Sequence, residues 1–184
     1  MDQTNRYRIN GRYMAAALVA VPATWLLHEG CHWIAGSALG YDMHMTLNAA
    51  YPASSRFRTG REEQLVSAAG PLVTLLQAVL VFMLMRQRSR YLLYPLLFTC
   101  FYMRVLAGVM SLIHPNDEAR VSQWLGIGTF TLPVIVATLL FIFLYKTTRQ
   151  YGFPAKLVVI TTLLVMLLSS ALILADRFVH IRLL

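Results

Sequence analysis

Long apolar segments separated by short polar ones run through most of the chain. Five of these segments lie at about residues 13–36, 65–85, 91–113, 124–145 and 155–175. Each reaches the roughly 20 residues that an α-helix needs to cross the hydrocarbon core of a bilayer. The pattern predicts an all-α integral membrane protein with about five transmembrane helices.

The polar connection after the first segment, residues 37–64, contains a stretch of different character. From Tyr41 to Asn48 polar and apolar residues alternate, as they do in a strand. This alternation favours a short β-hairpin after the first span, although an irregular loop fits the sequence as well. The connection is too short for a separate folded module, so we expect one helical bundle.

The composition agrees with a membrane protein. Hydrophobic residues make up 58% of the chain and charged residues only 13%, whereas roughly a quarter of residues are charged in soluble proteins. The net charge of +8 could indicate nucleic-acid binding. However, the basic residues gather at the ends of the spans, where the flanks of a lipid bilayer explain them, so we expect no nucleic-acid partner.

The distribution of Lys and Arg predicts an orientation. Nine flank the N-terminal side of the bundle: Arg6, Arg8, Arg12, Arg86, Arg88, Arg90, Lys146, Arg149 and Lys156. Six flank the other side: Arg56, Arg58, Arg61, Arg120, Arg177 and Arg182. The positive-inside rule therefore predicts a cytoplasmic N-terminus. Short loops and no organelle-targeting signal favour the bacterial cytoplasmic (inner) membrane.

The first predicted span ends in residues that can bind a metal. His28-Glu29-Gly30-Cys31-His32 is an instance of the H-E-x-x-H pattern. Residues four apart share one face of a helix, so His28 and His32 can ligate the same ion while Glu29 projects beside it. The pattern is typical of hydrolases with one Zn²⁺ per chain, in which the glutamate is the general base for a zinc-activated water.

A protein zinc site needs a third ligand, and Asp117 is the best-placed acidic residue. Three successive membrane crossings bring the end of the third span back to the level of the H-E-x-x-H motif. Pro115 would let an acidic side chain leave the helical path toward a polar cavity. Glu118 and His114 are alternative ligands. A solvated polar turn with Asp117 as a helix N-cap would explain the same residues without a metal.

Three ordered features resemble the site-2 protease family of intramembrane zinc metalloproteases. HEGCH at 28–32 matches its metal motif, Ala69-Gly70-Pro71 looks like its A-G-P-x-x-N segment, and Pro115-Asn116-Asp117 stands where its L-D-G motif supplies the aspartate ligand. The resemblance implies a three-helix catalytic core. It divides the chain into an N-terminal polar segment (1–12), a zinc metalloprotease membrane core (13–125), and two further transmembrane helices with a C-terminal tail (126–184).

Two departures indicate a divergent member of that family. Thr74 stands where the family has an asparagine that contacts substrate, and Glu118 follows Asp117 in place of glycine. Gly70 and Pro71 also have a rationale of their own, because small residues let membrane helices approach closely and proline suits the opening turn of a helix. The family's site lies toward the cytoplasmic side, whereas the charge count places this one toward the exterior.

Arg104 falls about midway through the third span, where a lone charge is costly and faces a partner or a cavity. An interhelical ion pair, snorkelling to the membrane surface, or support of a polarised substrate carbonyl would each account for it.

These features together predict an intramembrane zinc metalloendopeptidase that hydrolyses peptide bonds of membrane-spanning or membrane-associated proteins and peptides. Two alternatives stay open. One is a CAAX-processing or HtpX-type membrane metalloprotease with Glu118 as third ligand, and the other is a non-catalytic membrane subunit whose histidines bind metal structurally. The last two spans carry no catalytic residues and offer a surface for a membrane-protein partner.

Overall fold

The computed structural model describes residues 7–87, 90–179 and 182–184. Its long helices are α1 (Gly11–Ala38), α2 (Gly60–Gln87), α3 (Tyr94–Met110), α5 (Thr131–Tyr151) and α6 (Ala155–Val179). A short 3₁₀ helix, η2 (Tyr91–Leu93), leads into α3, and a short helix α4 (Asp117–Trp124) follows it. Arg6 and Arg88 of the charge count, with the rest of 1–6, lie outside the described residues.

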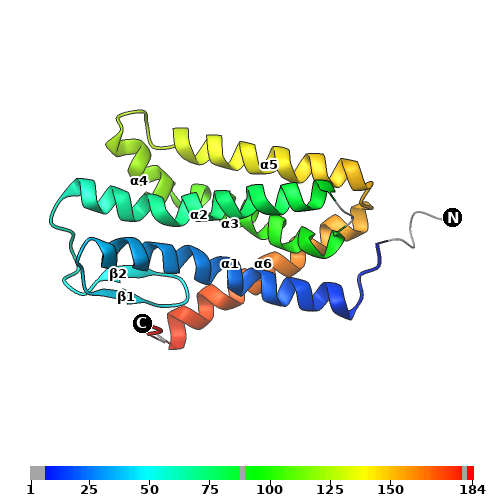
Figure 1. Ribbon diagram of the computed structural model, residues 1–184, viewed down its shortest axis with the longest axis horizontal. Helices are drawn as coiled ribbons and strands as arrows, with labels where there is room; N and C mark the ends of the chain where they lie inside the picture. Colours follow the sequence, from blue (N-terminus) through cyan, green and yellow to red (C-terminus); the bar gives the residue numbers. More distant parts are fainter. Residues whose placement is uncertain (1–6, 88–89, 180–181) are drawn as a thin grey trace.

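The helices form a bundle in which α1 packs against α2, α3 and α6 (Figure 1). Among the described residues, five helical segments are long and apolar enough to cross a membrane: Gly11–Ala38, Gly60–Gln87, Tyr91–Met110, Thr131–Tyr151 and Ala155–Val179. The predicted fold class, an all-α membrane protein with five spans, is confirmed.

The fourth span starts later than the sequence suggests. The expected segment began at 124, but α5 begins at Thr131. Gly126 and Gly128 have φ angles of +70° and +92°, which an α-helix cannot accommodate. Residues 124–130 are largely apolar, so hydropathy alone does not separate this turn from the helix that follows it.

A two-stranded antiparallel hairpin follows α1, as predicted. Strands β1 (Met43–Met45) and β2 (Ala50–Pro52) pair with His44 opposite Tyr51. Met43 packs so closely on α1 that a Cβ at Gly36 would overlap its side chain. The hairpin therefore lies against the same end of α1 that carries the H-E-x-x-H motif (Figure 1).

The end of α6 and the residues after it hold the hairpin in place through hydrogen bonds. Asp176 accepts hydrogen bonds from the Leu47 main-chain N–H at 2.9 Å and the Thr46 hydroxyl at 3.1 Å. The main chain of Met45 pairs with that of Leu183 and Leu184. These contacts give a short hairpin, which would be marginal alone, a fixed position beside α1.

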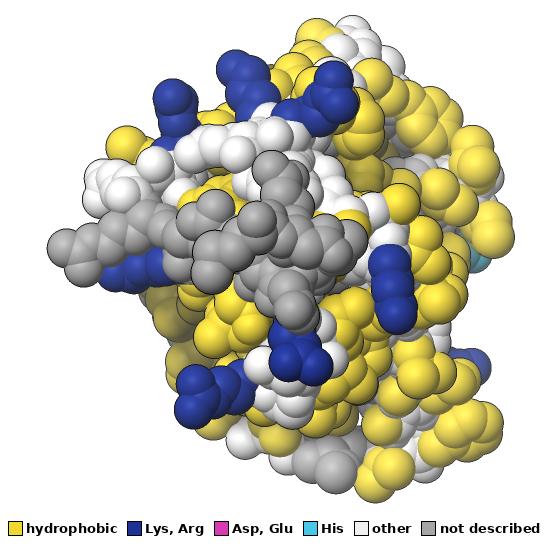
Figure 2. Space-filling model, turned by 90° about the vertical axis from the view of Figure 1, so that its right-hand side faces the viewer, with side chains coloured by type: hydrophobic (Ala, Val, Ile, Leu, Met, Phe, Trp, Pro, Cys, Tyr) yellow, Lys and Arg dark blue, Asp and Glu magenta, His cyan; other side chains and the backbone are white. Residues whose placement is uncertain are grey.

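The two ends of the bundle differ in character. At the N-terminal end an aromatic cluster fills the core, with the Tyr13 and Tyr91 rings stacked at 5.8 Å. The outer face of this end displays Lys and Arg, and no Asp or Glu is in view (Figure 2). The exposed basic side chains here are Arg8, Arg12, Arg86, Arg90, Lys146, Arg149 and Lys156. The H-E-x-x-H motif lies in the opposite half of α1.

Candidate metal centre

Three side chains from two distant parts of the chain converge beside α2. His28 and His32 lie four residues apart on α1, and Asp117 opens α4; all three are buried. The Nε2 atoms of the two histidines are 3.1 Å apart. Asp117 Oδ2 lies 3.2 Å from His28 Nε2 and 3.3 Å from His32 Nε2. The sequence had predicted these three residues as the ligand set, and the fold brings them together.

The size of this triangle can be compared with that of a zinc site. Zinc binds histidine nitrogen and carboxylate oxygen at about 2.0–2.2 Å in a tetrahedral arrangement, which separates neighbouring ligand atoms by about 3.3–3.6 Å. The observed separations of 3.1, 3.2 and 3.3 Å lie within about 0.2 Å of that range. The three residues can therefore hold a metal ion with little movement.

The second nitrogen of each ring has its own partner. His32 Nδ1 lies 2.6 Å from the Val66 carbonyl oxygen, which can only accept a hydrogen bond. His28 Nδ1 lies 3.0 Å from the Thr74 hydroxyl, whose proton is directed to the Gly70 carbonyl at 3.0 Å. Both Nδ1 atoms are therefore donors. Metal-binding histidines typically have such a partner for the second nitrogen.

This assignment leaves the two Nε2 lone pairs and a carboxylate oxygen facing one another. Three acceptors within 3.3 Å repel one another unless a cation lies among them or a ring takes up a further proton. A divalent metal ion satisfies all three at once. The donor set thus fits a metal better than a set of ordinary buried hydrogen bonds.

Asp117 is kept in the charged form by its surroundings. Burial raises the pKa of its carboxyl, but when no metal ion is bound and a ring takes up the further proton, interactions with His28 and His32 outweigh burial and hold the pKa well below its usual range. Arg120 contributes a hydrogen bond at 2.8 Å to the other carboxylate oxygen. Asn116, and not Asp117, occupies the N-cap position of α4, and its side chain makes no capping hydrogen bond.

Helix α2 supplies the surface against which the two histidines rest. Gly70 lies so close to them that a Cβ there would overlap His32 Nε2 and the His28 ring. Pro71 follows it, buried in the interior of the same helix and not in the opening turn that the sequence had suggested, because α2 already begins at Gly60. Thr74, one turn further on, is fully buried and engaged with His28. In this structure Thr74 therefore lies in a position to support a ligand, and its hydroxyl is not free for a substrate.

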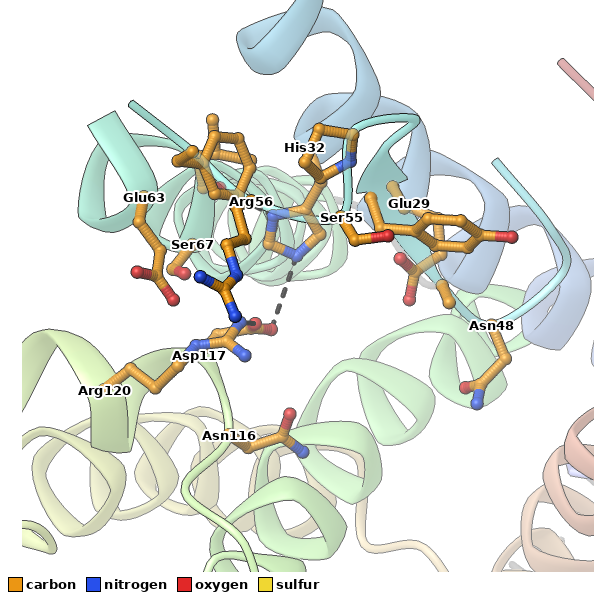
Figure 3. Close-up of a pocket in the computed structure, with 16 residues that line it drawn as sticks. Glu29, His32, Asn48, Ser55, Arg56, Glu63, Ser67, Asn116, Asp117 and Arg120 are labelled. Atoms are coloured by element: carbon orange, nitrogen blue, oxygen red, sulfur yellow. Dashed lines mark hydrogen bonds and ion pairs between the residues drawn. The ribbon is translucent and has the colours of Figure 1, made fainter. Parts of the chain in front are cut away.

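Glu29 lies between two cavities that meet at the cluster. The larger, of about 520 Å³, is lined by Glu29 and His32 together with the hairpin, the start of α2 and the start of α4. Figure 3 shows the Glu29 carboxylate directed into this space, with Arg56 and Arg120 entering it from the other side. The smaller, of about 290 Å³, lies on the α3 and α6 side. A buried carboxylate with cavity on both sides can reach a bound water or peptide.

The other predicted site residues take different places. Glu118 is buried and forms an ion pair with Arg104, Oε1 to Nη1, at 2.9 Å. It does not belong to the triangle of ligand atoms. His114 is exposed in the turn before Pro115 and is also separate from the cluster. The interhelical ion pair, one of the explanations considered for Arg104, is present.

Several residues at the site carry no signal in the sequence. The Val66 carbonyl is a main-chain group and could have come from any residue type. Asn48, Asn116 and Arg120 line the cavities, but isolated polar residues in loops and in a short helix such as α4 are too common to single out. The alternating stretch after the first span was the only available sign that the hairpin would form part of the wall.

No protein-family model, curated protein or solved structure matches this chain. Its function therefore has to be inferred from the residues of the site.

Proposed function

We propose that this protein is an intramembrane zinc metalloprotease, similar to the site-2 protease family, that hydrolyses peptide bonds of membrane-spanning or membrane-associated substrates. The observation that carries the proposal is the triangle of His28 Nε2, His32 Nε2 and Asp117 Oδ2, with both Nδ1 atoms engaged as donors elsewhere. Glu29 beside that triangle supplies the group that separates a hydrolase from a purely structural metal site.

Each part of the reaction has a residue suited to it. A zinc ion held by His28, His32 and Asp117 would supply the Lewis acid that activates water and a peptide carbonyl. Glu29 accepts a proton from the attacking water and returns it to the amine as the C–N bond breaks. The partners of the Nδ1 atoms keep the histidine rings from turning during this exchange.

The hairpin offers a surface for an extended peptide. The Thr46 N–H donates to Ala49 and the Ala53 N–H to Asp42, both at 2.8 Å, and His44 pairs with Tyr51. In this register the main-chain groups of Ala50 point away from β1. Because β2 lines the larger cavity beside Glu29, a substrate strand added to its outer edge would pass close to the cluster.

Zinc content and cleavage, measured together, test the proposal. Wild type, Glu29→Gln and Asp117→Ala proteins are purified in detergent, analysed for zinc, and incubated with transmembrane model peptides that are then examined by mass spectrometry. We expect about one zinc per chain and cleavage in wild type, zinc without cleavage in Glu29→Gln, and neither in Asp117→Ala. Asp42→Asn, which removes an exposed carboxylate outside both cavities, is the matched control and keeps both properties.

Two other results would argue against a protease. Wild type without zinc overturns the proposal. Zinc with no cleavage in wild type identifies a non-catalytic metal-binding subunit. A CAAX-processing or HtpX-type site requires a glutamate ligand, and the pairing of Glu118 with Arg104 speaks against that arrangement.

The proposed setting is the bacterial cytoplasmic membrane with the N-terminus in the cytoplasm. It is supported by the Lys and Arg side chains gathered at the N-terminal end (Figure 2). In this orientation the metal centre is nearer the outer side of the membrane. Cysteine labelling from either side, with single cysteines introduced near Arg90 and near Ser54, distinguishes the two orientations.

A further inference from the structure

The smaller cavity, on the α3 and α6 side of the metal centre, combines apolar walls with one guanidinium group and, toward the metal centre, the carboxylates of Glu29 and Asp117. It has a volume of about 290 Å³, and its apolar walls include Trp25, Met103, Leu106 and Ile173. Arg104 enters it from α3 and is only 3% exposed. A positive charge placed so deep within a membrane helix is costly and calls for an anionic or polar partner.

Glu118 satisfies only part of this guanidinium. Its carboxylate accepts from Nη1 at 2.9 Å. Nε is buried and has no hydrogen-bond partner among the described residues, and Nη2 faces His28 Nε2 at a long 3.5 Å. Nε and Nη2 share one edge of the planar guanidinium, and such an edge binds the two oxygens of a carboxylate side by side.

Metal binding would free this edge further. His28 Nε2 has one lone pair, so it cannot accept from Arg104 and ligate a metal through the same electrons. When His28 Nε2 ligates a metal ion, neither Nη2 nor Nε of Arg104 has an acceptor. Arg104 lines the cavity that also reaches Glu29 and Asp117, so an anion bound in that cavity can supply the acceptor that these two donors lack.

The geometry points to an anion-binding site in the smaller cavity, in which the Nε and Nη2 edge of Arg104 holds a carboxylate whose apolar substituent lies against Trp25, Met103 and Ile173. The ligand class is a carboxylate with a medium-sized aliphatic group, such as the free C-terminus of a peptide ending in an apolar residue. The site rests on the proposed function in two respects: zinc in the neighbouring cluster would free Nη2 from His28 Nε2, and it would strengthen binding by adding positive charge.

Trp25 provides a signal that does not depend on catalysis. In a Trp33→Phe, Trp124→Phe background, Trp25 is the sole tryptophan of the chain, and its fluorescence reports on the cavity that it lines. The probe is 4-methylpentanoate, and its neutral amide is the matched control ligand. We expect a saturable change with the carboxylate in both zinc-loaded and chelator-treated protein, and none with the amide.

Substitutions at the two partners of the ion pair distinguish an anion site from a purely structural bridge. Arg104→Met should weaken carboxylate binding at least about tenfold, with Arg104→Lys intermediate because a lysine keeps the charge and loses the two-pronged edge. Glu118→Gln should leave binding unchanged or strengthen it, because it removes a competing carboxylate. If the Arg104–Glu118 ion pair were only structural, Arg104→Met and Glu118→Gln would change carboxylate binding in the same way.

Removal of Arg104 alone leaves Glu118 as a buried unpaired charge and could unfold the protein. The double variant Arg104→Met, Glu118→Gln removes both charges, and it should fold while still losing carboxylate binding. Arg120→Met, which removes a positive charge from the opposite side of Asp117, should change binding by less than about threefold.

The results separate this inference from the proposed function. Saturable, Arg104-dependent carboxylate binding supports the anion site whether or not peptides are cleaved. No saturable change in wild type, or an undiminished change in the double variant, overturns it even if zinc and cleavage are both found.

Discussion

The Nδ1 atom of His32 lies 2.6 Å from the main-chain carbonyl oxygen of Val66 in α2. A backbone group therefore fixes the orientation of this ring, and no substitution at position 66 removes that carbonyl oxygen. The orientation of the two histidines in the candidate metal centre therefore depends on how closely α1 and α2 approach one another. Substitutions that separate these two helices should affect metal binding more than most substitutions of cavity-lining side chains.

Gly70 is the position where this dependence can be tested most directly. A methyl group there would overlap both histidine rings, so Gly70→Ala has to push the ligands or the helix away. We expect zinc binding to weaken by at least about tenfold, the lower end of what disturbed ligand orientation costs. Zinc titration against a competing chelator measures the change.

Gly30→Ala is the matched control for that experiment. Gly30 lies within the H-E-x-x-H motif itself, but a Cβ there meets nothing within 4 Å. Because alanine also favours a helix more than glycine does, by up to about 1 kcal/mol, the variant should fold normally and bind zinc like wild type. Equal loss of zinc in the two variants would contradict the role given to Gly70.

Thr74→Val removes the hydroxyl that accepts from His28 Nδ1 while keeping nearly the same shape. A buried donor without a partner costs about 1–3 kcal/mol, and loss of a ligand's second partner typically lowers metal affinity about 10–100-fold. Thr74→Ser, which retains the hydroxyl, should stay close to wild type. Competition with a chelator measures the zinc affinity of both variants. An unchanged affinity in the valine variant would show that this hydroxyl is dispensable.

Asp176→Ala should loosen the hairpin without disturbing the metal centre. The carboxylate of Asp176 receives the Leu47 N–H and the Thr46 hydroxyl, and both bonds are lost in the variant. Hydrogen exchange of the amides in residues 43–52 should become faster, while zinc content stays at the wild-type level. Arg177→Ala, at the neighbouring position, should leave the exchange rates unchanged. Equal exchange rates in the two variants would show that the hydrogen bonds of Asp176 do not hold the hairpin in place.

Removing the metal should lower the thermal stability of the folded protein. A ligand present at 100 times its Kd stabilises the state that binds it by about 2.7 kcal/mol. We therefore expect a chelator to lower the Tm in detergent by several degrees, and added Zn²⁺ but not Mg²⁺ to restore it. Asp117→Ala should show no response to either, and a response equal to that of wild type would exclude Asp117 as a ligand.

Much of the site could be predicted because its chemistry is local in sequence. The spacing of His28 and His32 is a property of one helix, and Asp117 follows from counting membrane crossings. The alternating residues from Tyr41 to Asn48 likewise gave the hairpin, because period-two patterning is local too. For the histidine pair and the hairpin a short stretch contains the physical reason, whereas Asp117 required the number and direction of three successive spans.

The parts that were missed depend on backbone conformation or on contacts between distant residues. Hydropathy placed the fourth span too early because it does not register the positive φ angles at Gly126 and Gly128. The pairing of Arg104 with Glu118 joins two helices, and nothing in either segment specifies the other. The role of Thr74 became visible only when its hydroxyl was found 3.0 Å from His28.

Asp117 and Glu118 are consecutive residues at the start of α4, yet one faces the histidine pair and the other faces Arg104. Side chains of successive helical residues point about 100° apart, so shifting α4 by one residue in one direction would put Glu118 in the place of Asp117 and Ala119 in the place of Glu118. A shift in the other direction would put Asn116 beside the histidines and Asp117 beside Arg104. A single insertion or deletion between α3 and α4 would cause such a shift. Evolution of this chain should therefore tolerate substitutions in that connection far more readily than changes in its length.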